Sequence, residues 1–165
     1  MRFKFYLIAF ILYTTSMITS LFFAIPAFKQ MDFPVGTFTR QLSFDEVKLQ
    51  RWLQIMQEGN RIHLITIQHR FDDWFALSFG LVFFSLGLLL SERFSIQSFK
   101  IFGSLGLLGG ILDLVENRIF LNMAADIQAI DSTSAIIFST VNFFKWGLYA
   151  IGIIGIIYVW LRKRS

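Results

Sequence analysis

The fold is decided by residues 101–121, which have the sequence IFGSLGLLGGILDLVENRIFL. As a helix that rises about 1.5 Å per residue, this stretch is long enough to cross the roughly 30 Å hydrocarbon layer of a membrane. Its first half is apolar and rich in glycine, whereas its second half contains Asp113, Glu116, Asn117 and Arg118. The stretch therefore predicts a membrane-spanning helix with polar and charged side chains near one end.

The composition of the whole chain agrees with a membrane protein. Of its 165 residues, 55% are hydrophobic and only 16% are charged, and the mean hydropathy is +0.61. These values exclude an ordinary soluble globular protein. The absence of cysteine excludes disulfides, thiolate catalysis, iron–sulfur clusters and zinc–thiolate sites. The net charge of +4 comes mostly from basic residues near the chain ends and helix boundaries, which favours a membrane and not nucleic acid as the partner.

Three further apolar stretches predict spanning helices, at residues 5–25, 74–90 and 135–161. We therefore expect an all-α protein in which residues 1–165 form a single membrane domain, an integral membrane four-helix bundle. The first stretch exceeds the roughly 7–15 apolar residues of a signal peptide, and this length favours an uncleaved anchor over a signal peptide cleaved at Ala27.

Basic residues in the short flanks predict the orientation of these helices. With four crossings, the flanks 1–4, 91–100 and 162–165 lie on one side of the membrane, and they carry Arg2, Lys4, Arg93, Lys100, Arg162, Lys163 and Arg164. The segments on the other side have no comparable excess of Lys and Arg. Because short basic flanks stay in the cytoplasm, we expect a multi-pass protein of the cell membrane with both termini cytoplasmic.

The long connection between the first two spans predicts an external helical segment at about residues 43–71. Ser43 and Glu46 match a capping box, in which their side chains satisfy free amides at a helix start. Apolar residues then recur at helical spacing at Leu49, Trp52, Leu53 and Met56. The pattern predicts an amphipathic helix that ends at Gly59 and either lies on the outer membrane surface or caps the bundle. From Arg61 to Phe71 the pattern fits either a strand or a helix that runs into Trp74, and it favours the helix.

Small and polar residues form stripes on the third and fourth predicted spans. The stripe on residues 101–121 comprises Gly103, Gly106, Gly110, Asp113 and Asn117. Its expected partner on residues 135–161 comprises Asn142, Lys145, Tyr149 and Gly152. Counted from the outer ends of the two spans, Asp113 and Lys145 both lie about 12–15 Å deep, so they can meet. The predicted ligand-binding site, or intramembrane polar cluster, comprises Asp113, Glu116, Asn117, Asn142 and Lys145.

Two interpretations of this cluster remain open. Holding an ionised group inside a membrane costs at least about 2.5–3.5 kcal/mol, so intramembrane charges are candidates for function. The alternative is a structural ion pair that fixes the register of two helices. One Lys145 does not neutralise both Asp113 and Glu116. Either Arg118 turns inward, or one carboxyl group binds a proton or a ligand cation.

Secondary candidates lie at the start of the second span, where His69 precedes Asp72 and Asp73 by about one helical turn. His63 and His69 are not adjacent on a helix, and no metalloprotease spacing is present, so we expect no metal and no cofactor. We interpret His69, Asp72 and Asp73, together with Arg70, as a solvated collar at the membrane interface.

Two more secondary candidates lie beside the predicted cluster. Arg118 directly follows Asn117, and Tyr149 is spaced to lie one turn from Lys145. Tyr149 and Trp146 are expected to pack against Lys145, with a cation-binding aromatic cage as the alternative.

The run Asp113-Leu114-Val115-Glu116-Asn117, followed in the next span by Lys145-Trp146, resembles a group of small four-span bacterial membrane proteins of unassigned function. These proteins carry an Asp-x-x-Glu-Asn run in helix three and a Lys-Trp pair in helix four. The resemblance covers the C-terminal third of the chain and implies that these polar residues belong together, without implying an activity. The four-span layout with buried carboxylates is also similar, more distantly, to the sterol-isomerase and sigma-2-receptor group, as an analogy of fold alone.

Three functions follow as hypotheses. The first is an outer-leaflet binding site for a lipid or small amphiphile, with an enzymatic version in which Asp113 or Glu116 is the acid or base and Lys145 stabilises charge. The second is a proton- or cation-coupled carrier, which four spans without an inverted repeat make less favourable unless the protein forms a homodimer. The third is a structural or assembly subunit with a membrane-protein partner. No serine-hydrolase elbow, phosphate-binding loop or dinucleotide motif is present.

Overall fold

The computed structural model describes residues 2–164, with side chains from Phe5 to Arg162, and this part of the chain contains helices and no strand. The elements in chain order are α1 (Arg2–Thr19), the π-helix η1 (Ser20–Ala24), α2 (Ile25–Met31), α3 (Thr37–Gln41), α4 (Glu46–Glu58), α5 (Ile62–Phe94), α6 (Ser98–Ala125), the 3₁₀ turn η2 (Ile127–Ala129) and α7 (Ser132–Arg164). The predicted all-α class is confirmed.

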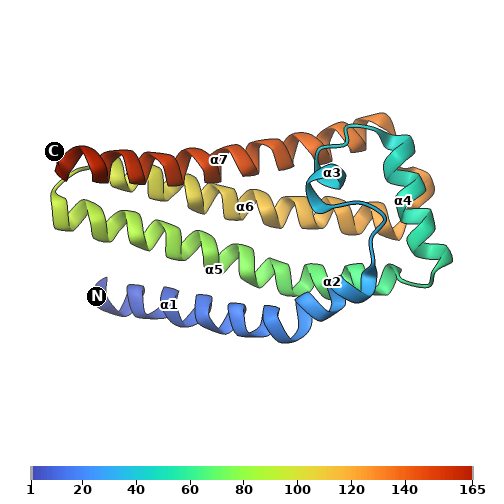
Figure 1. Ribbon diagram of the computed structural model, residues 1–165, viewed down its shortest axis with the longest axis horizontal. Helices are drawn as coiled ribbons and strands as arrows, with labels where there is room; N and C mark the ends of the chain where they lie inside the picture. The colour runs from blue at the N-terminus through green and yellow to red at the C-terminus, as the bar shows by residue number, and fades with distance from the viewer. Residues whose placement is uncertain (1, 165) are drawn as a thin grey trace.

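The long helices lie side by side along the molecule (Figure 1). The most extensive packing joins α5 to α6 and α6 to α7, whereas α1, η1 and α2 pack on α5. The short helices α3 and α4 lie at one end of the bundle, and the two chain ends lie at the other. The first helix is thus attached to the bundle mainly through α5.

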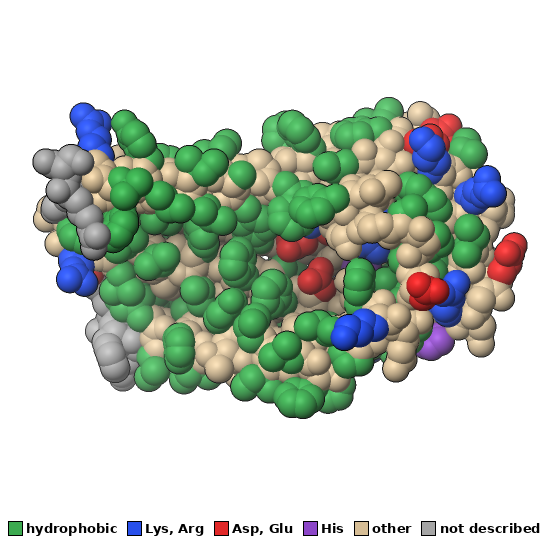
Figure 2. Space-filling view, in the orientation of Figure 1, with side chains coloured by type: hydrophobic (Ala, Val, Ile, Leu, Met, Phe, Trp, Pro, Cys, Tyr) green, Lys and Arg blue, Asp and Glu red, His purple; other side chains and the backbone are tan. Residues whose placement is uncertain are grey.

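In the described part of the chain, helices long and apolar enough to cross a membrane cover Phe5–Met31, Ile62–Phe94, Ser98–Ala125 and Ser132–Arg162. All the predicted spanning helices are therefore present, but each extends beyond its predicted range. The second differs most, because its helix begins at Ile62 and not at residue 74. Hydrophobic side chains cover much of the surface along the long helices (Figure 2), as expected for a transmembrane helical protein.

The added turns of the long helices enclose a hydrophobic core at the α4 end of the bundle. Its fully buried members include Met31, Leu49, Leu53, Met56, Ile65, Phe120 and Phe138. The Gln50 amide donates a hydrogen bond of 2.7 Å to the Ile130 carbonyl oxygen and joins α4 to the turn before α7. The external helix was expected either to lie on the outer membrane surface or to cap the bundle. In the structure α4 caps the end of the bundle.

The start of α4 differs from the expected capping box. The N-cap is Asp45, whose carboxylate accepts a hydrogen bond of 3.0 Å from the Lys48 amide. Ser43 does not cap the helix, and its buried hydroxyl has no hydrogen-bond partner. Phe44 adopts a left-handed conformation with φ of 50°, and its N–H donates to the Ser139 hydroxyl of α7 at 3.0 Å. The sequence prediction was wrong because this tertiary contact moves the helix start.

Glycines allow α5 and α6 to pack backbone against backbone. A Cβ atom added to Gly87 would lie 2.5 Å from the Phe99 carbonyl oxygen and 2.8 Å from the Gly103 Cα atom. A Cβ atom added to Gly110 would lie 2.7 Å from the Ala76 carbonyl oxygen. Gly103 and Gly110 of the predicted α6 stripe therefore face α5, whereas Asp113 of the same stripe meets Lys145 of the expected partner stripe on α7.

We expect Gly87→Ala to destabilise the protein by about 1–3 kcal/mol, because the new methyl group meets backbone atoms that have no rotamer to change. Gly147→Ala is the matched control, since nothing lies within 4 Å of its added Cβ atom. The measurement is the thermal midpoint of each purified variant in detergent. Equal midpoints for the two variants would show that the close approach of α5 and α6 is not needed.

Candidate functional site

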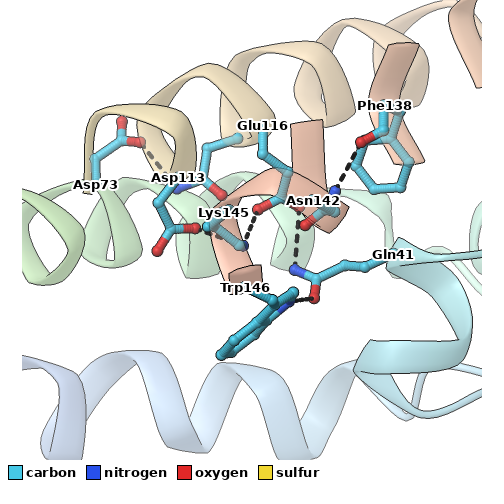
Figure 3. A network of polar contacts seen from close by, with 9 residues as sticks. Gln41, Asp73, Asp113, Glu116, Phe138, Asn142, Lys145 and Trp146 are labelled. Carbon is cyan, nitrogen blue, oxygen red and sulfur yellow. Dashed lines mark hydrogen bonds and ion pairs between the residues drawn. The ribbon is translucent and has the colours of Figure 1, made fainter. Parts of the chain in front are cut away.

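The centre of the candidate site is the Lys145 ammonium group of α7. Its Nζ atom lies 2.8 Å from Asp113 Oδ1 and 2.9 Å from Glu116 Oε2, both on α6 (Figure 3). The side chains of Lys145 and Glu116 are 3% and 1% exposed, and that of Asp113 is 14% exposed. Asp113 is therefore the member of the three that is open to a ligand.

Side chains of α3 extend this ion pair in a way that the sequence did not predict. The Gln41 amide donates to Glu116 Oε1 at 3.3 Å and accepts a hydrogen bond of 3.0 Å from the Trp146 indole N–H (Figure 3). Trp146 also lies beside the ammonium group, with its ring centre 5.1 Å from Lys145 Nζ. Gln41 thus connects α3 to both α6 and α7.

Both predicted asparagines are fully buried and only partly satisfied. The Asn142 amide donates to the Phe138 carbonyl oxygen on its own helix at 3.0 Å, and the Asn117 amide donates to Asp73 Oδ1 at 3.0 Å. The Oδ1 atoms of Asn117 and Asn142 are buried without a hydrogen-bond partner. Each leaves an acceptor that costs about 1–3 kcal/mol when nothing donates to it.

Arg118 turns outward and not toward Lys145. Its Nη2 atom lies 2.6 Å from Asp73 Oδ2, and its side chain is 66% exposed. The idea that Arg118 neutralises the second carboxylate of the cluster is therefore wrong. Arg118 instead forms an ion pair with Asp73, whose other carboxylate oxygen accepts a hydrogen bond from the Asn117 amide.

Arg40 of α3 is a buried cation that sequence reasoning missed. It is 2% exposed, and its guanidinium carbon lies 4.3 Å from the centre of the Phe120 ring and 5.1 Å from that of Phe33. Its Nε atom has no hydrogen-bond partner. Burial lowers the pKa of Arg40, and the neighbouring carboxylates of Glu116 and Asp72 oppose that shift. No sequence signal distinguishes Arg40 from a solvated basic residue in a connecting segment.

The predicted solvated collar on α5 is wrong for His69. Its ring is 1% exposed and stacks on Phe120 with the ring centres 5.2 Å apart. Because the Ile65 carbonyl oxygen only accepts, the 2.8 Å contact places the proton on Nδ1 of His69. His69 is therefore packed in the bundle interior, because its helix face is covered by Phe120 of α6.

Asp72 faces a groove between α5 and the η1–α2 segment. The groove has a volume of about 300 Å³, and its lining includes Asp72, Gln68, Ser20, Ala24 and Phe28. Gln68 Oε1 is buried without a partner. In Figure 2, acidic and basic atoms are visible in the middle of one face, surrounded by hydrophobic side chains. Charged groups are therefore exposed on one side of the bundle, among apolar side chains.

The aromatic neighbours of the cluster pack as predicted. Tyr149 is 8% exposed, and its ring meets those of Phe79 and Trp146 edge to face, with centres 5.3 and 6.2 Å apart. Among the described residues, no group of three His, Cys, Asp or Glu side chains is placed to hold a metal ion. Acid–base chemistry, charge stabilisation and hydrogen bonding are what this set of side chains offers.

Comparison with models of protein families, with curated proteins and with solved structures finds no match to the chain.

We expect Lys145→Met to cost about 3–5 kcal/mol of stability, because it leaves Glu116 and Asp113 buried without their cation. Adding Glu116→Gln to Lys145→Met should recover part of the loss, since one of the two charges is then removed. The check is the thermal midpoint of the single and double variants in detergent.

The control for this cycle is Lys48→Met, which breaks the exposed ion pair of Lys48 with Asp45 and should change the midpoint little. A Lys145→Met midpoint as close to wild type as that of Lys48→Met would contradict the description of Lys145 as a structural centre.

Proposed function

We propose that this chain is a multi-pass protein of the cell membrane, with both termini cytoplasmic, that binds the head group of a lipid or small amphiphile at the polar cluster around Lys145. The long apolar helices support the membrane location. The basic residues that flank these helices at the end with the two termini support the orientation. We include in this proposal the resemblance to small four-span membrane proteins, which rests on the Asp-x-x-Glu-Asn run and the Lys-Trp pair.

The depth of the cluster supports a ligand from the outer leaflet. At about 1.5 Å per residue, Asp113 lies about 22 Å along α6 from Ser98, and Lys145 lies about 25 Å along α7 from Arg162. If the hydrocarbon layer of about 30 Å begins at these helix ends, both residues lie a few ångströms inside its outer boundary. A head group at the outer surface is within reach of this position.

The observation that carries the proposal is the set of buried polar atoms without partners. Asn117 Oδ1, Asn142 Oδ1 and Arg40 Nε lack hydrogen-bond partners, although the network around Lys145 is otherwise well connected. A bundle selected only for stability would replace such groups with apolar side chains. A ligand with both donors and acceptors would satisfy them, and this explains why they are retained.

A route for the ligand is provided by the groove at Asp72. Its other walls are largely apolar, with Leu21, Ile25 and Phe28 from the first helical segment and Phe75 from α5. An amphiphile would place its tail along these side chains and its head toward Asp72. In the enzymatic version of the proposal, Asp113 or Glu116 transfers a proton and Lys145 stabilises the developing negative charge.

A structural role is the second candidate, and the geometry of Lys145 favours it. Two carboxylates within 2.9 Å of one ammonium group hold α6 and α7 in register whether or not a ligand binds. A protein that only assembles with a partner needs no more than this.

Lipid retention separates the two candidates. Asp113→Asn keeps the shape of the side chain and removes the charge at the open side of the cluster. It should reduce the amount of the natural amphiphile that co-purifies with the protein, measured by mass spectrometry of the extracted lipids. Glu58→Gln, an exposed carboxylate at the end of α4, is the control and should leave retention unchanged. Loss of thermal stability in Asp113→Asn with unchanged retention would favour the structural role.

A further inference from the structure

A second charged pocket lies between α5 and α6, and it shares no residue with the groove at Asp72. It has a volume of about 430 Å³ and is lined by Arg70, Asp73, Trp74, Leu77, Leu114 and Arg118. Around Arg70 the pocket carries guanidinium groups and an indole ring, whereas around Leu77 and Leu114 it is formed by leucine side chains. Charged groups followed by aliphatic side chains match the charged head group and the acyl chains of a phospholipid.

The guanidinium groups of this pocket have donors to spare. Both oxygens of Asp73 are occupied, one by the Asn117 amide and one by Arg118 Nη2. Asp73 therefore orients Arg118 and leaves its other N–H groups free. Among the described residues, Arg70 makes no ion pair, and its side chain is exposed. With two guanidinium groups and one carboxylate, the pocket has a net charge of +1 and accepts an anion.

The level of the pocket along the helices matches that of lipid phosphates. Trp74 lies about 30 Å along α5 from Phe94, and Arg118 lies about 30 Å along α6 from Ser98. If the opposite membrane boundary lies at Phe94 and Ser98, both residues lie one hydrocarbon thickness of about 30 Å from it. Arg70 lies one turn beyond Trp74, in the head-group layer, and tryptophan is typical of the boundary itself.

An apolar groove continues from the pocket toward the membrane interior. This groove between α1 and α5 has a volume of about 320 Å³ and shares Trp74 and Leu77 with the charged pocket. Apart from Thr15, its hydroxyl-bearing residues are bonded within the protein: Ser16 and Ser78 bind each other at 2.6 Å, and Thr19 donates to the Ser16 carbonyl oxygen at 3.0 Å. The remaining wall is apolar and suits an acyl chain.

We propose that the charged pocket and the α1–α5 groove together bind one phospholipid with a net negative head group. The phosphate contacts Arg70 and Arg118, the indole of Trp74 lies at the level of the ester groups, and one acyl chain occupies the groove. The net charge of the pocket selects phosphatidylglycerol over phosphatidylcholine. The inference rests on the membrane-spanning part of the proposed function and is independent of the cluster around Lys145.

The test is native mass spectrometry of the full chain, released from detergent after incubation with equal amounts of phosphatidylglycerol and phosphatidylcholine that have the same acyl chains. We expect phosphatidylglycerol to be retained preferentially. Arg70→Gln should lower that preference about fivefold, the effect of one basic residue near an anionic lipid head. Arg51→Gln removes an exposed arginine of α4 and should leave the preference unchanged.

Two further measurements identify the occupant. Thr15→Phe fills the groove and should reduce retention of both lipids without changing the preference between them. Glycerol 3-phosphate, which has the charged group and no chains, should not displace bound phosphatidylglycerol.

Three results would overturn the inference: equal lipid preference in Arg70→Gln and Arg51→Gln, displacement of the lipid by glycerol 3-phosphate, or a second copy of the chain bound in place of lipid. Extraction of the protein from membranes by alkaline carbonate would instead contradict the proposed membrane location.

Discussion

The structure depends on the burial of one ammonium group between two carboxylates. Removing an amine and a carboxylate from water costs several kcal/mol for each ion, and only close contact offsets that cost. Lys145 meets both Asp113 and Glu116 at hydrogen-bond distance in one register of α6 and α7. A slip of one turn would separate the charges and leave all three buried alone. The ion pair therefore fixes the register of α6 and α7. The apolar outer surfaces of these helices do not by themselves favour one register over another.

The rest of the molecule divides on either side of this ion pair. Toward the chain ends, the long helices expose large apolar side chains, and glycines such as Gly87 and Gly103 bring α5 and α6 into backbone contact. Toward α4, the same helices enclose a core that includes Leu53 and Phe120, away from any lipid. The first part needs lipid around it, whereas the second is packed like the interior of a soluble domain. The polar cluster lies where these two environments meet, and α3 supplies Gln41 to close it on that side.

The sequence predicts the long helices and the residues of the central cluster, but it does not predict how the segment between the first two spanning helices packs against them. Apolar stretches predict spanning helices because length and hydrophobicity alone satisfy a bilayer. The similar depths of Asp113 and Lys145 predict that these two residues can meet, but not that Lys145 contacts Asp113 and Glu116 together. The position of Arg40 depends on a short helix folding back over Phe120, a contact distant in sequence that no local pattern encodes. His69 was misplaced for a related reason: the first turns of α5 pack against Phe120 and the core at the α4 end, so a residue that the hydropathy places in solvent is buried.

Arg40 and Lys145 show why stability alone is a poor account of this cluster. Both are buried cations near carboxylates, yet Lys145 has two oxygens within 2.9 Å, whereas Arg40 is held by aromatic rings with its Nε atom unpaired. Leaving a guanidinium group partly unsatisfied while Asp72 faces an open groove is costly for a folded protein by itself. The nearby carboxylates of Glu116 and Asp72 offset part of this cost by their charge. The two buried cations therefore differ: the contacts of Lys145 account for its burial, whereas those of Arg40 leave part of its hydrogen-bonding capacity unused.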